Sequence, residues 1–355
     1  MSHLQNIQKK LKTDALLVTS EVNLRYLTGF YYSDGCTVVT HDRAYLITDF
    51  RYKEAAEATV SDEFAVLCPK SIRDTLCELL GSGEVCTVAV EEATLSAQDL
   101  ERLRTIMPKT EFSFGGSALL DGARQIKDAG EIEKMKRAQA ITDAAFEHIL
   151  NFIDPSRTEI EIALELEFFM RSHGAESVAF QTITVSGSAS SLPHGVPRPV
   201  KLERGFLTMD YGACVDGYCS DMTRTVVIGK ADEEIKRLYN TVLSAQLAAL
   251  DAAKNGERRG FTLDKIARDV IEDAGYHGAF GHSLGHGVGM YIHEAPRLAP
   301  RTPKDELLCS GNVVTFEPGI YLEGKYGCRI EDMAVITDDG IYNFTKSPKE
   351  LIEIK

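Results

Sequence analysis

The chain has 355 residues, more than the roughly 250–300 residues over which one hydrophobic core usually extends, so two domains are expected. Its apolar content of 44% and charged content of 26% are ordinary for a folded protein and argue against disorder. A formal net charge of -14, without any run of lysine and arginine, argues against nucleic-acid binding, because phosphate neutralisation requires a basic surface.

The sequence shows no targeting signal and no disulfide framework. Residues 1–18 lack the pattern of a secretory signal, and no apolar run reaches the roughly 18 residues of a membrane span. The eight cysteines are scattered, without CxxC pairs or the density of a disulfide scaffold. The sequence therefore predicts a cytoplasmic protein that binds neither membrane nor nucleic acid.

The first third of the chain alternates short strands and helices. Apolar runs predict strands at 15–19, 36–40, 44–48 and 87–91, and helical spacing predicts helices at 51–58 and 72–80. A glycine- and serine-rich segment at 113–125 breaks this pattern. We place a small α/β domain at residues 1–122 and a second domain at residues 123–355.

The second domain is expected to contain two pairs of helices. A long amphipathic helix begins near Gly130, and a shorter one follows a capping box formed by Thr158 and Glu161. Another long helix stops at Gly256, and a shorter one spans about 262–275. Strands follow each pair, so the order long helix, short helix, strands occurs twice.

A short sequence repeat supports this duplication. Leu192–Val196 reads LPHGV and Leu284–Val288 reads LGHGV, and each follows one of the shorter helices. Matches of five residues also arise by chance, but the equivalent placement favours an α+β domain with internal pseudo-twofold symmetry.

A hairpin signal brings two aspartates together. Asp216-Gly217 lies between two strand-like runs and is typical of a two-residue turn. With that turn, Gly212 lies opposite Asp221 and leaves room for an ion, and Asp210 lies on the same face two residues further along. Like charges on one face are costly unless a cation neutralises them. Two solvent-exposed aspartates would explain the hairpin equally well.

Histidines gather in a second segment. Three of the nine histidines, His282, His286 and His293, lie within twelve positions. A single histidine is more often a buried core residue than a ligand, but this density favours a functional site. The glycines around them favour close backbone packing over a regular helix.

A third segment, residues 313–336, is interpreted as two apolar strands around a turn. Glu317 lies in the first strand and Glu331 in the second, where an unpaired carboxylate is costly. Arg329 alternates onto the face of Glu331 and would orient it. A buried arginine–glutamate pair is the alternative interpretation.

Together the three segments offer four carboxylates and one imidazole: Asp210, Asp221, His286, Glu317 and Glu331. Two divalent cations would balance the four negative charges. An oxygen-rich set with one histidine suits manganese, cobalt, iron or zinc. Two such ions ~3.5–4 Å apart can activate a water molecule for attack on a carbonyl carbon. The sequence thus predicts a dinuclear metal hydrolase.

These segments resemble a known family. DYGACVDGYCSD, HSLGHGVGMYIHEAP, FEPG and RIED look like the metal-binding motifs of the pita-bread metallopeptidases, which include methionine aminopeptidase, aminopeptidase P and prolidase. NLRYLTGF and YLITDFRY resemble the creatinase-like N-terminal domain of the proline-specific branch. The resemblance therefore covers the whole chain and implies a creatinase-like domain followed by a pita-bread catalytic domain.

The resemblance also implies how the metal ions are held. Asp210 and Asp221 would hold one ion, and Asp221 would also bridge to a second ion held by His286 and Glu317. Glu331 would bridge the pair, with Arg329 as its outer partner. Manganese is the expected metal, with cobalt, zinc and iron as alternatives.

Substrate-facing roles follow from the same resemblance. Glu317 would act as the acid and base, and His194 and His293 would contact the substrate or the tetrahedral intermediate. His282 matches a further pocket histidine of the proline-specific branch. Arg297 stands where some prolidases bind the substrate carboxylate, although an arginine in a solvent-facing loop is an equally good interpretation.

The implied substrates are short peptides with proline in the second position, and the implied assembly is a homodimer. Aminopeptidase P-like activity is the preferred hypothesis, and a prolidase restricted to Xaa-Pro dipeptides is the alternative. A metal-free creatinase-like hydrolase and a non-catalytic binding protein are less favoured, because every ligand position and both His194 and His293 are retained.

Overall fold

The computed structural model describes residues 1–81 and 83–355, which form two compact units, Met1–Arg124 and Gln125–Lys355. Among the residues described, no helix combines the length and the apolar character that crossing a membrane would require.

The first unit is an α/β domain, as predicted, and its helices surround a six-stranded mixed sheet with strand order β4-β3-β2-β1-β5-β6. Its strands are β1 (Ala15–Val18), β2 (Gly35–Thr40), β3 (Ala44–Thr48), β4 (Ala65–Leu67), β5 (Thr87–Val90) and β6 (Glu111–Ser113). Its helices are α1 (His3–Lys10), α2 (Glu21–Thr28), α3 (Phe50–Thr59), α4 (Ile72–Leu80), α5 (Ala97–Ile106) and α6 (Gly116–Arg124). The four predicted strands and two predicted helices are confirmed.

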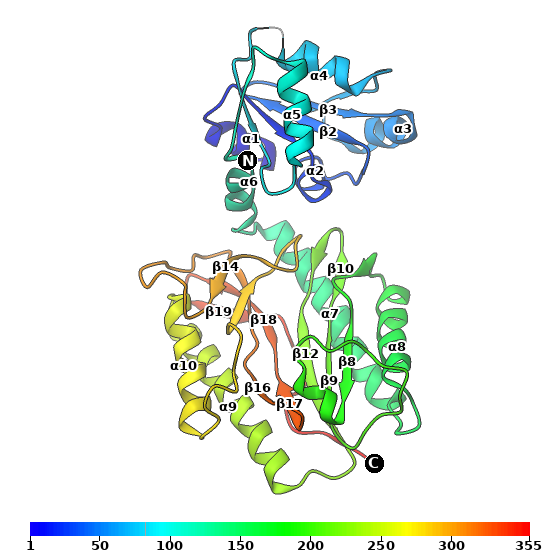
Figure 1. The fold of residues 1–355 in the computed structure, drawn as a ribbon, viewed down its shortest axis with the longest axis vertical. Helices are drawn as coiled ribbons and strands as arrows, with labels where there is room; N and C mark the ends of the chain where they lie inside the picture. The colour runs from blue at the N-terminus through cyan, green and yellow to red at the C-terminus, as the bar shows by residue number, and fades with distance from the viewer. Residues whose placement is uncertain (82) are drawn as a thin grey trace. The chain divides into compact units, whose positions relative to one another are not determined.

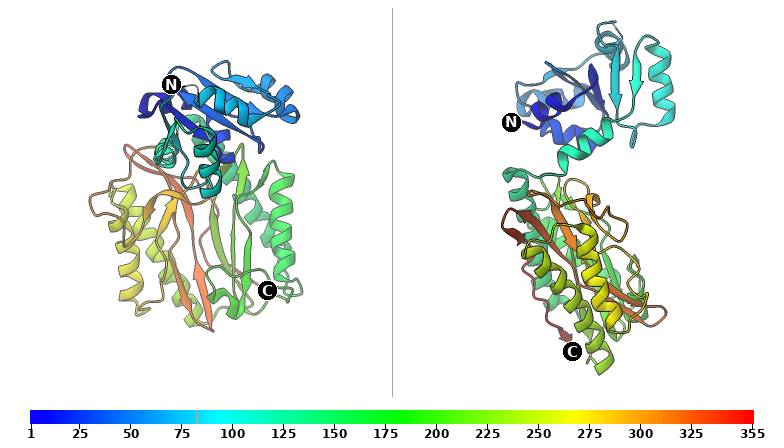
Figure 2. Two further views of the ribbon diagram at one scale, coloured as in Figure 1. Left: turned by 45° about the horizontal axis from the view of Figure 1, so that its top comes forward. Right: turned by 90° about the vertical axis from the view of Figure 1, so that its left-hand side faces the viewer.

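Helices cover both faces of this sheet (Figure 2). Successive side chains of a strand point to opposite faces. Accordingly, Leu17 packs with Leu76 of α4 and Leu103 of α5, whereas Leu16 contacts the start of α6 at Gly116. Most of the segment interpreted as a break at 113–125 is helix α6. Gly116 allows this helix to lie close to the sheet, since a Cβ atom there would lie 2.4 Å from the Val90 carbonyl oxygen.

The second unit contains two helix pairs, as predicted: α7 (Ala129–Phe152) and α8 (Glu159–Ser172), then α9 (Glu233–Lys254) and α10 (Gly260–Asp273). The strands of its first half are β7 (Ser177–Val178), β8 (Ile183–Ser186), β9 (Gly205–Tyr211), β10 (Ala213–Val215), β11 (Tyr218–Cys219) and β12 (Met222–Ile228). Those of its second half are β13 (Gly285–Gly287), β14 (Glu294–Leu298), β15 (Val313–Phe316), β16 (Gly319–Leu322), β17 (Tyr326–Arg329), β18 (Asp332–Thr337), β19 (Gly340–Asn343) and β20 (Glu353–Ile354).

Each half of this unit has its own helix-on-sheet core (Figure 1). Helices α7 and α8 pack on the sheet β20-β12-β9-β8, and α9 and α10 pack on the sheet β14-β13-β15-β18-β19. The capping box of Thr158 and Glu161 starts α8 as predicted. The two related segments differ locally, since Gly285–Gly287 forms β13 whereas His194 lies in a turn.

The third segment contains four strands, so the prediction of two was wrong. β15 ends before Glu317, and β17 ends before Glu331. The amide of Glu317 donates to the Leu284 carbonyl at 2.7 Å, and the amide of Glu331 donates to the Thr223 carbonyl at 3.1 Å. Both glutamates thus lie where the chain changes hydrogen-bonding partner.

The hairpin register matches the prediction, with Cys214 opposite Cys219 and Tyr211 opposite Met222. The reason given for Gly212 was wrong. A Cβ atom there would lie 1.9 Å from the Ser220 carbonyl oxygen, so a close backbone approach, rather than space for an ion, requires glycine. Gly285 is similar, because its Cβ would lie 1.9 Å from the Thr315 carbonyl oxygen.

We predict that Gly285→Ala lowers the free energy of unfolding of the metal-free protein by about 2–3 kcal/mol, because the backbone of β15 must move. Gly281→Ala is the control, since no atom lies within 4 Å of its Cβ position. Chemical denaturation of both variants measures the difference. Equal stability of the two variants would contradict the packing argument.

Candidate metal centre

One cavity of about 430 Å³ lies in the second unit, between strands of its two halves. Its lining includes all ten side chains singled out in the sequence: His194, Asp210, Asp221, His282, His286, His293, Arg297, Glu317, Arg329 and Glu331. The cavity volume is typical of a small-molecule site.

A buried cluster of acidic groups and one imidazole forms the floor of the cavity. Asp221, His286 and Glu331 each offer a ligand atom, and these atoms lie within 4.8 Å of one another. The Nε2 atom of His286 lies 3.6 Å from Asp221 Oδ2 and 3.3 Å from Glu317 Oε1. Side chains from both halves of the unit therefore meet here.

Asp210, at the end of β9, is held by Arg329, whose Nη2 atom donates to Asp210 Oδ2 at 2.6 Å. The other oxygen, Oδ1, is buried and meets no hydrogen-bond donor within the described part of the chain. A buried carboxylate oxygen without a donor fits a cation ligand.

Arg329 does not orient Glu331 by direct contact as expected. Its Nε atom donates to Thr223 Oγ1 at 2.9 Å, and that hydroxyl donates to Glu331 Oε2 at 2.7 Å. Its Nη1 atom donates to the Tyr321 hydroxyl at 2.8 Å. Sequence reasoning missed Thr223 and Tyr321. The only signal for Thr223 is that it alternates onto the same face of the strand as Asp221.

Burial and mutual repulsion disfavour ionisation of the carboxyl groups. Burial, followed by the charges of Asp210 and Glu317, raises the pKa of Asp221 well above its ordinary value. Burial, followed by neighbouring carboxylates, does the same to the pKa of Glu331. Burial raises the pKa of Glu317 to about 8. Divalent cations would remove this repulsion, so the donor set fits them.

Histidines and one arginine surround the cluster. Burial lowers the pKa of His286 to about 3 and that of His282 to about 4, so both imidazoles are neutral near pH 7. His282 Nε2 lies 3.0 Å from the Tyr321 hydroxyl, and the rings of His286 and His293 lie 4.3 Å apart. Arg297, on β14, is exposed and adds a positive charge to the cavity wall.

The fold and this site define a class of protein. The family model described as "Metallopeptidase family M24" matches residues 133–338, and that described as "Creatinase/Prolidase N-terminal domain" matches residues 1–126. The chain therefore belongs to the M24 family of metallopeptidases.

Three relatives that match nearly the whole chain are peptidases named for proline. The Xaa-Pro dipeptidase of Bacillus anthracis superposes with a TM-score of 0.92 at 41% identity, covering 99% of this chain and 98% of that chain. The X-Pro aminopeptidase of Thermotoga maritima superposes with a TM-score of 0.91 at 37% identity, covering 98% and 99%. The Xaa-Pro dipeptidase of Pyrococcus furiosus is 37% identical over 96% of this chain and 95% of its own length.

We predict that the metal-free protein loses stability as the pH rises from 6.5 to 8. The folded-state pKa of Glu317 is raised to about 8, so its neutral form stabilises the fold at low pH, and that contribution is lost as the carboxyl ionises. The lowered histidine pKa values act in the opposite sense, but only below about pH 6.5.

Chemical denaturation in the presence of a chelator, at several pH values, measures this loss. Excess Mn²⁺ should abolish it, and Glu317→Gln should reduce it because one of the repelling groups is removed. A metal-free protein whose stability does not fall across this pH range would contradict the electrostatic account.

Proposed function

We propose that this protein hydrolyses the peptide bond between an N-terminal residue and a proline in the second position. The observation that carries the proposal is the convergence of Asp221, His286 and Glu331, with Asp210 and Glu317 beside them, on one cavity. The full-length similarity to proteins named Xaa-Pro dipeptidase and X-Pro aminopeptidase supports proline as the second residue.

Five side chains would hold two divalent cations in this proposal: Asp210, Asp221, His286, Glu317 and Glu331. Bound divalent cations supply Lewis acidity, which polarises a carbonyl group and makes water a stronger acid. Manganese is our first choice, with cobalt, zinc and iron as alternatives, because an oxygen-rich set with one imidazole accepts all of them.

The other steps belong to side chains of the cavity. Glu317, whose carboxylate lies in the cavity 3.3 Å from His286 Nε2, is placed to take a proton from water and to pass it to the proline nitrogen as the bond breaks. His293 and His194, both exposed in the cavity wall, would donate hydrogen bonds to the substrate carbonyl oxygen as negative charge develops there. His282 would line the proline pocket, and Arg329 would fix the orientation of Asp210.

Arg297 favours a dipeptide substrate as a second, narrower form of this function. An exposed guanidinium on the cavity wall is suited to bind a free carboxylate, which a dipeptide presents directly after proline. Longer peptides lack a carboxylate at that position. The cavity therefore gives the prolidase alternative more weight than the sequence does.

We also propose a homodimer in the cytoplasm. The resemblance to the family supports the homodimer. The cytoplasmic location is supported by the cysteines, all of which are free among the residues that the structure describes. Light scattering on the purified protein tests the first proposal, and cell fractionation tests the second.

We predict that Glu331→Gln and His286→Ala each lower peptidase activity by at least ~100-fold, because loss of a ligand's outer partner alone typically costs 10–100-fold. Thorough chelation of the unaltered protein should have the same effect, and added Mn²⁺ should restore activity only in the unaltered protein. Circular dichroism checks that the variants are folded. Full activity after chelation would end the metal assignment.

We predict that Arg297→Gln raises KM for Xaa-Pro dipeptides by ~10–100-fold, because a charge-assisted hydrogen bond is lost. Xaa-Pro-Xaa tripeptides serve as the matched substrates, and their KM should change little. Steady-state kinetics on both series give the comparison. If both series respond equally, Arg297 does not read the carboxylate.

A further inference from the structure

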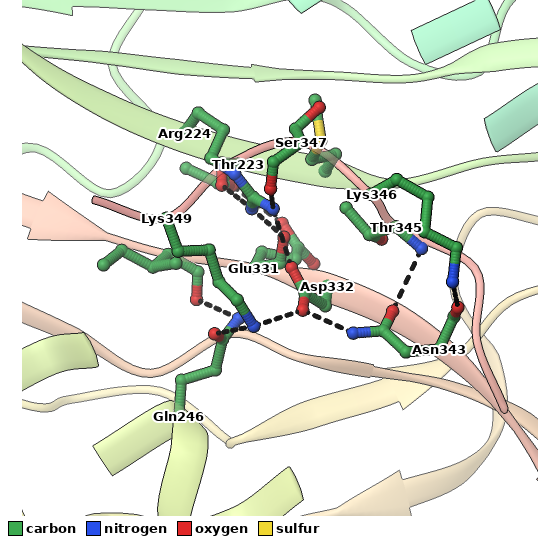
Figure 3. Close-up of polar contacts among 12 residues, drawn as sticks. Thr223, Arg224, Gln246, Glu331, Asp332, Asn343, Thr345, Lys346, Ser347 and Lys349 are labelled. Atoms are coloured by element: carbon green, nitrogen blue, oxygen red, sulfur yellow. Dashed lines mark hydrogen bonds and ion pairs between the residues drawn. The ribbon is translucent and has the colours of Figure 1, made fainter. Parts of the chain in front are cut away.

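A second polar cluster, the Lys349 network, lies behind the acidic cluster of the cavity. It consists of Arg224, Gln246, Asp332 and Lys349, which come from β12, α9, β18 and the segment before β20 (Figure 3). Arg224 is 1% exposed, and Gln246 and Asp332 are fully buried. Charged groups this deep in a protein are costly unless they are paired and hydrogen-bonded, and here they are both.

The amide of Gln246 fixes the backbone beside both glutamates of the candidate metal centre. Its Nε2 atom donates to the Phe316 carbonyl at 3.2 Å and to the Ile330 carbonyl at 3.2 Å. These residues directly precede Glu317 and Glu331. Phe316 still pairs with Asp332 of β18, but β15 and β17 end before the two glutamates, whose amides donate to Leu284 and Thr223 instead.

Arg224 holds the other side of the same backbone. Its Nη1 atom donates to the Glu331 carbonyl at 2.6 Å and to the Thr223 carbonyl at 3.0 Å. Its Nη2 atom forms an ion pair with Asp332 Oδ1 at 2.9 Å. The backbone of Glu331 is therefore held on the side that faces away from the cavity.

Lys349 connects Gln246 with the Arg224–Asp332 pair (Figure 3). Its Nζ atom donates to Gln246 Oε1 at 3.0 Å and to Asp332 Oδ2 at 2.6 Å. The carbonyls of Ser347 and Pro348, in the same segment, accept from Arg224 at 2.9 and 3.1 Å. Lys349 thus contacts both the Gln246 amide, which holds the backbone beside Glu317 and Glu331, and the Asp332 carboxylate, which pairs with Arg224.

We propose that Lys349 is a positioning residue for the metal centre, acting through Gln246 and the Asp332–Arg224 pair on the backbone of Glu317 and Glu331. Metal sites require ligands held to about half an ångström, which supporting hydrogen bonds provide. Removing the ammonium group takes away the donor to Gln246 Oε1, so the orientation of the amide then depends on its two carbonyl partners alone. The inference rests on the proposed function in taking those glutamates as ligands.

Lys349→Met tests the proposal, because it keeps the length of the side chain and removes its charge and donors. The variant should bind Mn²⁺ ~10–100-fold more weakly in calorimetric titrations. The visible spectrum of the Co²⁺-loaded protein should change, since ligand geometry changes. At saturating metal, kcat should fall more than KM rises. Lys349→Arg should restore part of the affinity.

Lys346→Met is the matched control. Lys346 lies in the same segment, but its Nζ atom donates to the Asn343 carbonyl and contacts no member of the Lys349 network. The metal affinity and the Co²⁺ spectrum of the Lys346→Met variant should equal those of the unaltered protein. Equal losses in both variants would overturn the proposal in favour of a general effect of the segment.

Gln246→Glu provides a second test that does not depend on the folding of Lys349→Met. It keeps an acceptor for Lys349 and replaces the donor to the two carbonyls, so Mn²⁺ affinity should again fall. Unaltered metal affinity and spectrum in a folded variant, with only a lower free energy of unfolding, would overturn the proposal. These readouts stay informative if the unaltered protein binds metal but does not cleave Xaa-Pro peptides, an outcome that would reject the proposed function alone.

Discussion

The rest of the second unit depends on the burial of several carboxylates around one imidazole. Burial, followed by mutual repulsion, raises the pKa values of Asp221 and Glu331 well above their ordinary values. Only Arg329 supplies a direct positive partner, to Asp210, among the contacts of the described residues. The fold therefore holds the cluster by backbone geometry, and divalent cations would supply the opposite charge that the cluster lacks.

Backbone geometry explains why the strands break where they do. In a continuous strand the alternation of side chains fixes the face to which a carboxylate points. Where the strand is interrupted, the backbone can turn and direct the carboxylate into the cavity. Pro318 signals the first break, because it lacks an amide hydrogen. Nothing in the sequence signals the second, since the amide of Glu331 bonds to Thr223, which is distant in the chain. The two-strand prediction was wrong for that reason.

Local patterns were predictable, and contacts between distant segments were not. The Asp216-Gly217 turn fixes the hairpin register from neighbouring residues alone, and carboxylates in apolar runs are conspicuous in any sequence. Gly212 was misinterpreted because its constraint is the carbonyl of Ser220 across the hairpin, and a residue pattern does not reveal so close a backbone approach. Thr223 and Tyr321 were missed because a hydroxyl in a strand is ordinary until its partners are known.

Strand β12 shows how one element serves both the site and its support. The side chain of Thr223 donates to the Glu331 carboxylate, while that of Arg224, one residue later, points to the opposite side of the strand and donates to the Glu331 carbonyl. Alternation along a strand makes this division automatic. One face of β12 contacts the carboxylate cluster, and its other face carries the buried guanidinium of Arg224. Glu331 is therefore fixed twice, at its carboxylate and at its backbone, by adjacent residues.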